Sequence, residues 1–162
     1  MNDEKFRIRR DDRALTREEA ERILREAEFG TLAMTDPDGN EPYGVPVSFV
    51  FARGAVWIHS ACAGRKYEIL KNSPRVHFSA AQNVEAAFTR YFTSFYESAM
   101  VFGRIVPVTD ETEKREALRE LCRKYLPGHM DVADEHISRS IGRTAIFRLV
   151  PEALTAKAKR RS

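Results

Sequence analysis

The chain has 162 residues, with 27 Lys and Arg against 24 Asp and Glu and a formal net charge of +3. Hydrophobic residues make up 43% and charged residues 31% of it, which is ordinary for a globular protein and excludes a largely disordered chain. The length suits a single domain over residues 1–162. No stretch is apolar over the ~18 residues that a membrane helix needs.

The N-terminus and the cysteines indicate the compartment. Residues 1–14 are charge-dense and are expected to form an arm over the surface, without the apolar segment of a secretory signal. Cys62 and Cys122 are too few for a disulfide framework, so free thiols are expected. We therefore expect a cytoplasmic protein that has no membrane partner.

The excess of positive charge lies at the C-terminus. Four cations are among the last six residues: Lys157, Lys159, Arg160 and Arg161. Without these four, the rest of the chain has a net charge of −1. We expect residues 156–162 to be a solvated basic tail rather than part of a domain-wide patch, so a nucleic-acid partner is not expected.

Capping signals and apolar spacing indicate the helices. Thr16 and Glu19 form a capping box for a helix over residues 17–28, which Gly30 is expected to end. Three further helices are expected, over residues 65–70, 110–125 and 132–140.

Alternation and turn residues indicate six strands. They are expected over residues 31–35, 43–51, 55–60, 75–79, 96–108 and 144–150. Residues 80–93 are expected to form an irregular connection. Because most of these strands follow one another as antiparallel neighbours, the expected fold is mainly β with helices: a six-stranded antiparallel barrel flanked by α-helices.

The second expected strand contains a proline. Alternation places Val45, Val47 and Phe49 on one face. Pro46 and Ser48 fall on the other face. A proline inside a strand leaves one hydrogen-bond donor of the ladder missing. Two interpretations stay open: an edge strand, or a strand whose exposed backbone contacts a ligand.

Residues 57–66 have the order of a strand, a loop of small residues, two adjacent cations and a helix start. A helix N-terminus attracts anions through its free N–H groups and its dipole. Arg65 can bind phosphate oxygens in bidentate fashion, and Lys66 adds a point charge. Ser60 offers a hydroxyl, and Gly64 lets the backbone approach closely. The segment predicts a phosphate site, with a solvated helix start as the plain alternative.

Three motifs resemble those of the pyridoxamine 5′-phosphate oxidase-like flavoproteins, which are FMN-binding split barrels. The first combines His-Ser at 59–60, Gly-Arg-Lys at 64–66 and Asn-Ser-Pro at 72–74. The second, residues 97–104, is similar to the family's long strand that ends in Gly-Lys or Gly-Arg. The third, residues 43–49, resembles the strand along the flavin ring, and its Pro-Val-Ser-Phe is most similar to the nitroimidazole-reductase-like branch. The resemblance covers about residues 14–155.

This resemblance implies FMN as the cofactor and a homodimer that binds it at the subunit interface. Arg65 and Lys66 match the phosphate ligands, assisted by Ser60 and Gly64. Ser98 matches a position that reaches the cofactor from the second subunit. Five residues would line the flavin ring: Val45, Pro46, Val47, Ser48 and Phe49. The aromatic residues Trp57 and Tyr96 are further candidates for packing near the ring.

His59 is the candidate catalytic residue because it precedes the phosphate segment. A histidine there could protonate a reduced substrate or hydrogen-bond the flavin, and a packing role is the alternative. His129 and His136 have acidic residues between them, but their spacing fits no tetrahedral zinc pattern. No metal is expected.

Two departures from the family's vitamin B6 oxidases bear on the substrate. Those enzymes have Arg and Lys at the ends of the ring-lining strand, where this chain has Gly44 and Phe49. They end in an Arg-Pro-x-Arg segment, where this chain has Ala-Leu-Thr-Ala-Lys at 153–157. We therefore expect no pyridoxamine phosphate oxidation, but an apolar pocket for flat neutral acceptors such as nitroaromatics or quinones.

The expected function is that of an FMN-dependent oxidoreductase with a small-molecule substrate. The alternative is a non-enzymatic flavin- or haem-binding module, which split barrels also provide. A deazaflavin-dependent reductase is disfavoured, because the sequence shows no expanded basic groove for a polyglutamate tail.

Overall fold

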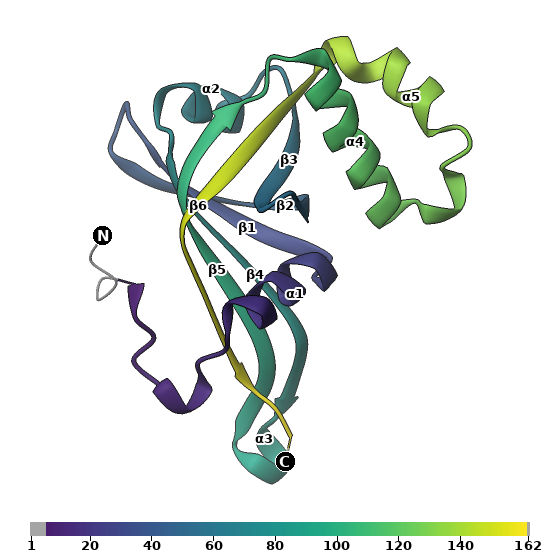
Figure 1. The fold of residues 1–162 in the computed structure, drawn as a ribbon. Coiled ribbons are helices and arrows are strands. Elements are labelled where there is room, and N and C mark those ends of the chain that lie inside the picture. The colour runs from purple at the N-terminus through teal and green to yellow at the C-terminus, as the bar shows by residue number, and fades with distance from the viewer. Residues whose placement is uncertain (1–5, 162) are drawn as a thin grey trace.

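The computed structural model describes residues 6–161. Six antiparallel strands close into one ring in the order β1-β2-β3-β6-β5-β4, which confirms the expected barrel (Figure 1). The strands are β1 (Phe29–Asp36), β2 (Glu41–Ala52), β3 (Ala55–Ala61), β4 (Arg75–Ala87), β5 (Thr93–Pro107) and β6 (Thr144–Lys159). The α-helices are α1 (Arg17–Glu26), α2 (Arg65–Asn72), α3 (Phe88–Tyr91), α4 (Glu111–Tyr125) and α5 (Ala133–Ser140).

The start of α1 confirms the capping box. The Glu19 N–H donates to Thr16 Oγ1 at 3.3 Å, and the Thr16 N–H donates to Glu19 Oε2 at 3.2 Å. The expected end of this helix was wrong, since α1 ends at Glu26 and Gly30 lies inside β1. A Cβ on Gly30 would lie 2.1 Å from the Phe78 ring, so this glycine allows close packing rather than ending a helix.

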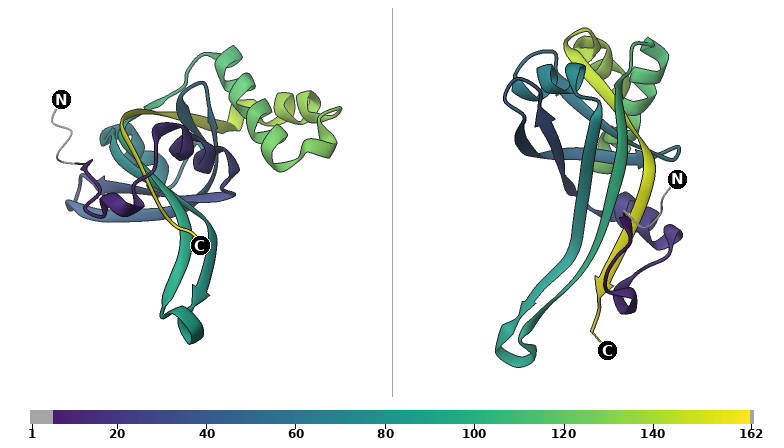
Figure 2. Two further views of the ribbon diagram at one scale, coloured as in Figure 1. Left: turned by 60° about the horizontal axis from the view of Figure 1, so that its bottom comes forward. Right: turned by 90° about the vertical axis from the view of Figure 1, so that its left-hand side faces the viewer.

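The β4–β5 hairpin is longer than expected. Residues 80–93 are not an irregular connection, because β4 continues to Ala87 and only the short α3 precedes β5. The pairing of β4 with β5 shifts register between Gln82 and Glu85. The hairpin projects beyond the ring, with α3 at its tip (Figure 2).

The C-terminal residues are not a solvated tail. β6 runs to Lys159 and pairs with β5 up to Tyr96. Lys159 Nζ donates to Thr93 Oγ1 at 2.6 Å, and Arg160 Nε donates to the buried Glu97 at 2.7 Å. Lys159 and Arg160 therefore contact residues of β5, whereas the sequence predicted that they would lie in solvent.

The core has two parts. Inside the ring, Phe49 and Phe78 pack with their ring centroids 4.7 Å apart, and α1 covers one end with Ile23 and Leu24. The second part lies outside the ring, where Trp57 is buried together with residues of α4. No helix in the described part of the chain has both the length and the apolar character to cross a bilayer.

Candidate functional site

Within the closed ring, β2 changes its partner along its length. Residues 41–48 of β2 pair with β1, whereas residues 49–52 pair with β3. Residues 59–61 of β3 pair with β6 and not with β2. The barrel is therefore split between these two segments. Pro46 lies in the half of β2 that pairs on one side, so its missing N–H is tolerated, as expected for an edge.

The chain turns from β3 into α2 on this side of the barrel. Gly64 precedes the helix with φ 98° and ψ 165°, a backbone conformation that disfavours other residues. No side chain caps the N-terminus of α2 within residues 6–161. The free N–H groups of the first turn and the positive end of the helix dipole thus remain available to an anion. We call this region, Ser60–Lys66, the β3–α2 corner.

Arg65 is held in place by the hairpin between β1 and β2. Its Nε donates to Asp36 Oδ2 at 3.1 Å, and its guanidinium carbon lies 4.7 Å from the centre of the Tyr43 ring. Its terminal guanidinium nitrogens donate to no acceptor of residues 6–161 and can serve a ligand. The side chain is 56% exposed, so these nitrogens are accessible from solvent.

Lys66 and Ser60 lack partners in the corner. Lys66 is half-buried and forms no hydrogen bond or ion pair with any described residue. Burial lowers the pKa of its amine, because the charged form is poorly solvated there. Ser60 is 7% exposed, and its hydroxyl is likewise without a partner in residues 6–161. A half-buried cation without a partner and a buried hydroxyl without one are each groups that an anion can satisfy.

His59 lies on the opposite face of β3 from Ser60. Residues alternate along the strand, so Ser60 shares its face with the core residue Ile58, and His59 shares the outer face with Trp57. Burial lowers the pKa of His59, and the positive charge of Lys66 lowers it further. Its imidazole is therefore held in the neutral form near pH 7, within the electrostatic reach of Lys66.

The five residues that were expected to line the flavin ring have their side chains on two faces of β2. Val45, Val47 and Phe49 face the core, as alternation predicted, and Phe49 is fully buried. The side chains of Val47 and Phe49 therefore lie in the interior of this chain, which leaves their backbone for contact with a cofactor, and the ring-lining role of residues 45–49 stays a prediction. The backbone N–H of Phe49 already has a hydrogen-bond partner, since it donates to Tyr125 Oη at 2.9 Å.

Because the Phe49 side chain lies in the interior, its presence in place of a basic residue does not show that a ligand pocket is apolar. The expectation of an apolar pocket then depends on Gly44. Gly44 stays relevant, because it is exposed on the single-paired half of β2. Trp57 is 2% exposed, and its Nε1–H donates to the Ala52 carbonyl at 2.8 Å. It packs under α4 and not at the corner.

Pro46 and Ser98 lie together on the outer face of the sheet. They line a shallow groove of about 390 Å³ with Met100 and residues of β1 and β4. Ser98 Oγ donates to the Lys157 carbonyl at 3.4 Å. Ser98 does not line the β3–α2 corner of its own chain.

Sequence reasoning missed three residues of the site region. Asp36 and Tyr43 hold Arg65 from the two sides of a turn, and Tyr125 arrives from α4. Tyr43 was expected only as the start of a strand, and its contact with Arg65 depends on the barrel closing. Among residues 6–161 no cluster of three or more His, Cys, Asp or Glu side chains is arranged to hold a metal ion.

Comparisons with known proteins agree with this geometry. The family model described as pyridoxamine 5′-phosphate oxidase matches residues 16–158. A search of curated proteins found no match.

Several solved structures share the fold. One is a candidate 5-nitroimidazole antibiotic resistance protein from Bacteroides thetaiotaomicron, with 23% identity and a TM-score of 0.76 over 90% of this chain and 86% of that chain. A conserved hypothetical protein from Mycobacterium tuberculosis has 16% identity and a TM-score of 0.80 over 96% of both chains. An FAD- and haem-binding protein from Mycobacterium smegmatis has 19% identity and a TM-score of 0.76 over 90% of this chain and 72% of that chain.

Proposed function

Because the chain belongs to the pyridoxamine 5′-phosphate oxidase family, a family of flavin-binding split barrels, we propose that it binds FMN and is an oxidoreductase for small molecules. One observation carries the proposal: the half-buried Lys66 has no partner in residues 6–161 and adjoins the uncapped N-terminus of α2. A phosphate monoester supplies the negative charge that this corner lacks.

The residues present fit a phosphate group. Arg65 offers two terminal nitrogens in a direction fixed by Asp36 and Tyr43. Lys66 contributes charge, and Ser60 contributes a hydroxyl. Gly64 keeps the approach open, since a Cβ there would meet no atom within 4 Å. The flavin, when bound, supplies the electron transfer, and these side chains bind and orient it.

The second part of the proposal is a homodimer that shares the cofactor. Ser98 and Pro46 lie on an outer sheet face, apart from the corner, so Ser98 would contribute to a site on a second copy. Large apolar side chains are exposed on the same molecule, with Phe29 at 57% and Phe92 at 89%. A stable dimer of this kind buries on the order of 2,000 Å².

The proposed substrates are flat electron acceptors such as nitroaromatics and quinones, and not pyridoxamine phosphate. Gly44 supports this, because it leaves the single-paired half of β2 without a cation at that position. The similarity to the candidate nitroimidazole resistance protein points in the same direction. We propose that His59 assists by holding or donating a proton, with a pKa that rises when an anion offsets Lys66.

A second candidate function is a binding module for FAD or haem without catalysis. The similarity to the FAD- and haem-binding protein favours it. The visible spectrum of the purified protein distinguishes the two cofactor classes, since oxidised flavin and haem absorb at different wavelengths. Turnover of a nitroaromatic by the flavin-loaded protein then distinguishes an enzyme from a binding module.

The proposal is tested by titrating FMN into the apo-protein and following the quenching of flavin fluorescence. Arg65→Ala and Lys66→Ala are each expected to weaken binding at least tenfold, because each removes a charge-assisted contact. Lys71→Ala is the matched control, since Lys71 lies in the last turn of the same helix beside Glu68. Equal FMN affinity in all four proteins would exclude the β3–α2 corner.

The dimer is tested by light scattering of the FMN-loaded protein. A mass of about twice 18.6 kDa is expected. A monomer that retains FMN would contradict the shared site, whereas the phosphate contacts of the corner would still stand.

A further inference from the structure

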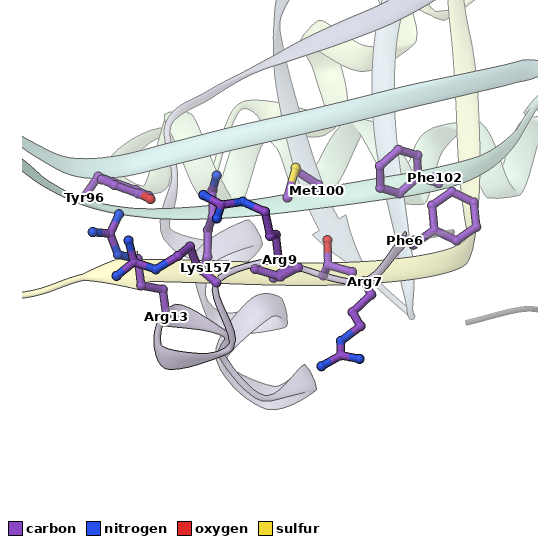
Figure 3. A pocket seen from close by; sticks show the side chains of 11 residues that line it. Phe6, Arg7, Arg9, Arg13, Tyr96, Met100, Phe102 and Lys157 are labelled. Carbon is purple, nitrogen blue, oxygen red and sulfur yellow. The ribbon is translucent and has the colours of Figure 1, made fainter. Parts of the chain in front are cut away.

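A hollow of about 440 Å³ lies between the N-terminal arm and the outer faces of β5 and β6 (Figure 3). The arm, residues 6–15, is fixed at both ends. Phe6 packs on Phe102 of β5 with the ring centroids 4.5 Å apart, and the Leu15 N–H donates to the Ala156 carbonyl at 2.9 Å. We call the space that the arm covers the arm pocket.

The arm pocket is lined by cations. They are Arg7, Arg9, Arg10, Arg13 and Lys157. No carboxylate side chain of residues 6–161 is among its lining residues. Two acids of the arm, Asp11 and Asp12, pair with Arg7 and Arg10, so the five lining cations outnumber the acids that pair with them.

Two of these cations have no ion-pair partner in the described part of the chain. Arg9 and Lys157 have no carboxylate within 4 Å, and Arg13 forms only a long ion pair of 4.0 Å with Asp12. Arg7 differs: its Nη2 donates to Asp11 at 2.7 Å, and Figure 3 shows its side chain turned away from Met100. Arg9, Arg13 and Lys157 lie toward the end of the pocket at Tyr96 (Figure 3).

The remaining wall of the pocket is apolar and aromatic. Tyr96, Met100 and Phe102 project from β5, with the Phe6–Phe102 ring pair at the end opposite Tyr96 (Figure 3). Thr155 Oγ1 is buried in this wall without a hydrogen-bond partner. Such an unpaired hydroxyl is costly, so a ligand or water that approaches it lowers the free energy.

We propose that the arm pocket binds a flat aromatic molecule that carries one carboxylate or phosphate. The anion lies against Arg9, Arg13 and Lys157, and the aromatic part lies against Met100 and the neighbouring rings. The volume is within the range of small-ligand pockets, and the combination of apolar walls with few converging charges is typical of them. The site contains neither Arg65 nor Lys66, but it shares Met100 with the groove that Ser98 lines, so it adjoins the face proposed to reach the second copy's cofactor.

The test is calorimetric titration of the full-length protein with three probes: 2-naphthoate, 1-naphthyl phosphate and 2-naphthamide. The two anions are expected to bind and the neutral amide at least tenfold more weakly. The stronger of the two anions identifies the preferred acidic group. Arg9→Ala and Arg13→Ala are each expected to weaken binding of the anions about tenfold, which corresponds to about 1.4 kcal/mol.

Two controls locate the binding. Arg17→Ala removes an arginine that follows the arm, lies outside the pocket lining and is paired with Glu21, and it is expected to change affinity less than twofold. Lys66→Ala is also expected to leave the naphthoate affinity unchanged, even where it abolishes FMN binding. Equal binding of amide and acid, unchanged affinity in both Arg9→Ala and Arg13→Ala, or loss of naphthoate binding in Lys66→Ala would overturn the proposal.

Discussion

Arg65 and Asp36 form a hydrogen-bonded ion pair of 3.1 Å between the first residue of α2 and the last residue of β1. Asp36 is 16% exposed and Arg65 is 56% exposed, so the acid is fixed in the turn while the guanidinium reaches solvent. The Tyr43 ring supports the same guanidinium from the start of β2. The pair therefore restricts Arg65 before any ligand binds, which lowers the entropy lost on binding.

Replacing Asp36, which orients Arg65, tests the contribution of that orientation while Arg65 keeps its charge. Asp36→Asn is expected to weaken FMN binding about threefold to tenfold, because Arg65 keeps its charge but loses its fixed direction. The free energy of unfolding is expected to change by less than about 1 kcal/mol, since the ion pair is largely exposed. FMN titration and urea unfolding measure the two effects. An affinity equal to that of the wild type would show that Tyr43 alone orients Arg65.

The titration of His59 reports the charge of the corner. The pKa of His59 is lowered by burial and by the positive charge of Lys66, so Lys66→Ala is expected to raise it toward the ordinary value of 6.5. Inorganic phosphate is expected to raise it in the wild type, because the bound anion offsets Lys66. Histidine ring resonances followed by NMR against pH measure both shifts. His77 lies on another strand and serves as the internal reference. An unchanged His59 pKa in both experiments would show that the charge of the β3–α2 corner does not act on His59.

Local signals predicted much of the fold and of the corner. The capping box at Thr16 needs residues only three positions apart, and the Gly-Arg-Lys segment that starts α2 is continuous in sequence. The end of β4 and the C-terminal half of β6 were not predicted, because residues 80–87 lack strong apolar alternation. Their strand conformation comes from pairing with distant residues of β5.

Long-range contacts account for the other errors. Arg160 looks like part of a basic tail in the sequence, yet it lies beside Glu97, a residue of another strand. The burial of Phe49 follows from the closed ring, where the ring of Phe78 packs against it. The sequence showed on which side of β2 Phe49 lies, but not that this side is the interior.

The Tyr125 hydroxyl connects α4 with two edges of the barrel. It accepts from the Phe49 N–H at 2.9 Å and lies 2.6 Å from the Glu28 carbonyl, to which it can donate. Tyr125→Phe leaves these backbone groups unpaired. The free energy of unfolding, measured in urea, is therefore expected to fall by about 1–3 kcal/mol. Hydrogen exchange at the Phe49 amide is expected to accelerate as well. Tyr91→Phe, at an exposed tyrosine of α3, is the control and is expected to be neutral. Equal losses in both variants would contradict the role of the hydroxyl.

Glu97 is the acid that joins α1, β4 and the end of the chain. Burial alone would raise its pKa, but hydrogen bonds from Gln82, Arg22 and Arg160 outweigh this and lower the pKa to about 2. The ordinary value is 4.5, so the ionised Glu97 stabilises the fold above pH 4.5. That stabilisation, about 3 kcal/mol for a shift of this size, is lost as the pH falls from 4.5 to 2.

Glu97→Gln therefore tests the network through its pH dependence. At pH 7 the variant is expected to be less stable than the wild type, because four side chains that donate to Glu97 lose a charged acceptor. Between pH 5 and pH 2 the difference is expected to shrink, since the wild type loses its carboxylate over that range. Urea unfolding at pH 7, 5, 4 and 3 measures the difference. Glu116→Gln, at an exposed pair with Arg53, is expected to show no such convergence. A difference between wild type and Glu97→Gln that stays constant with pH would show that the stability comes from packing and not from the ionised carboxylate.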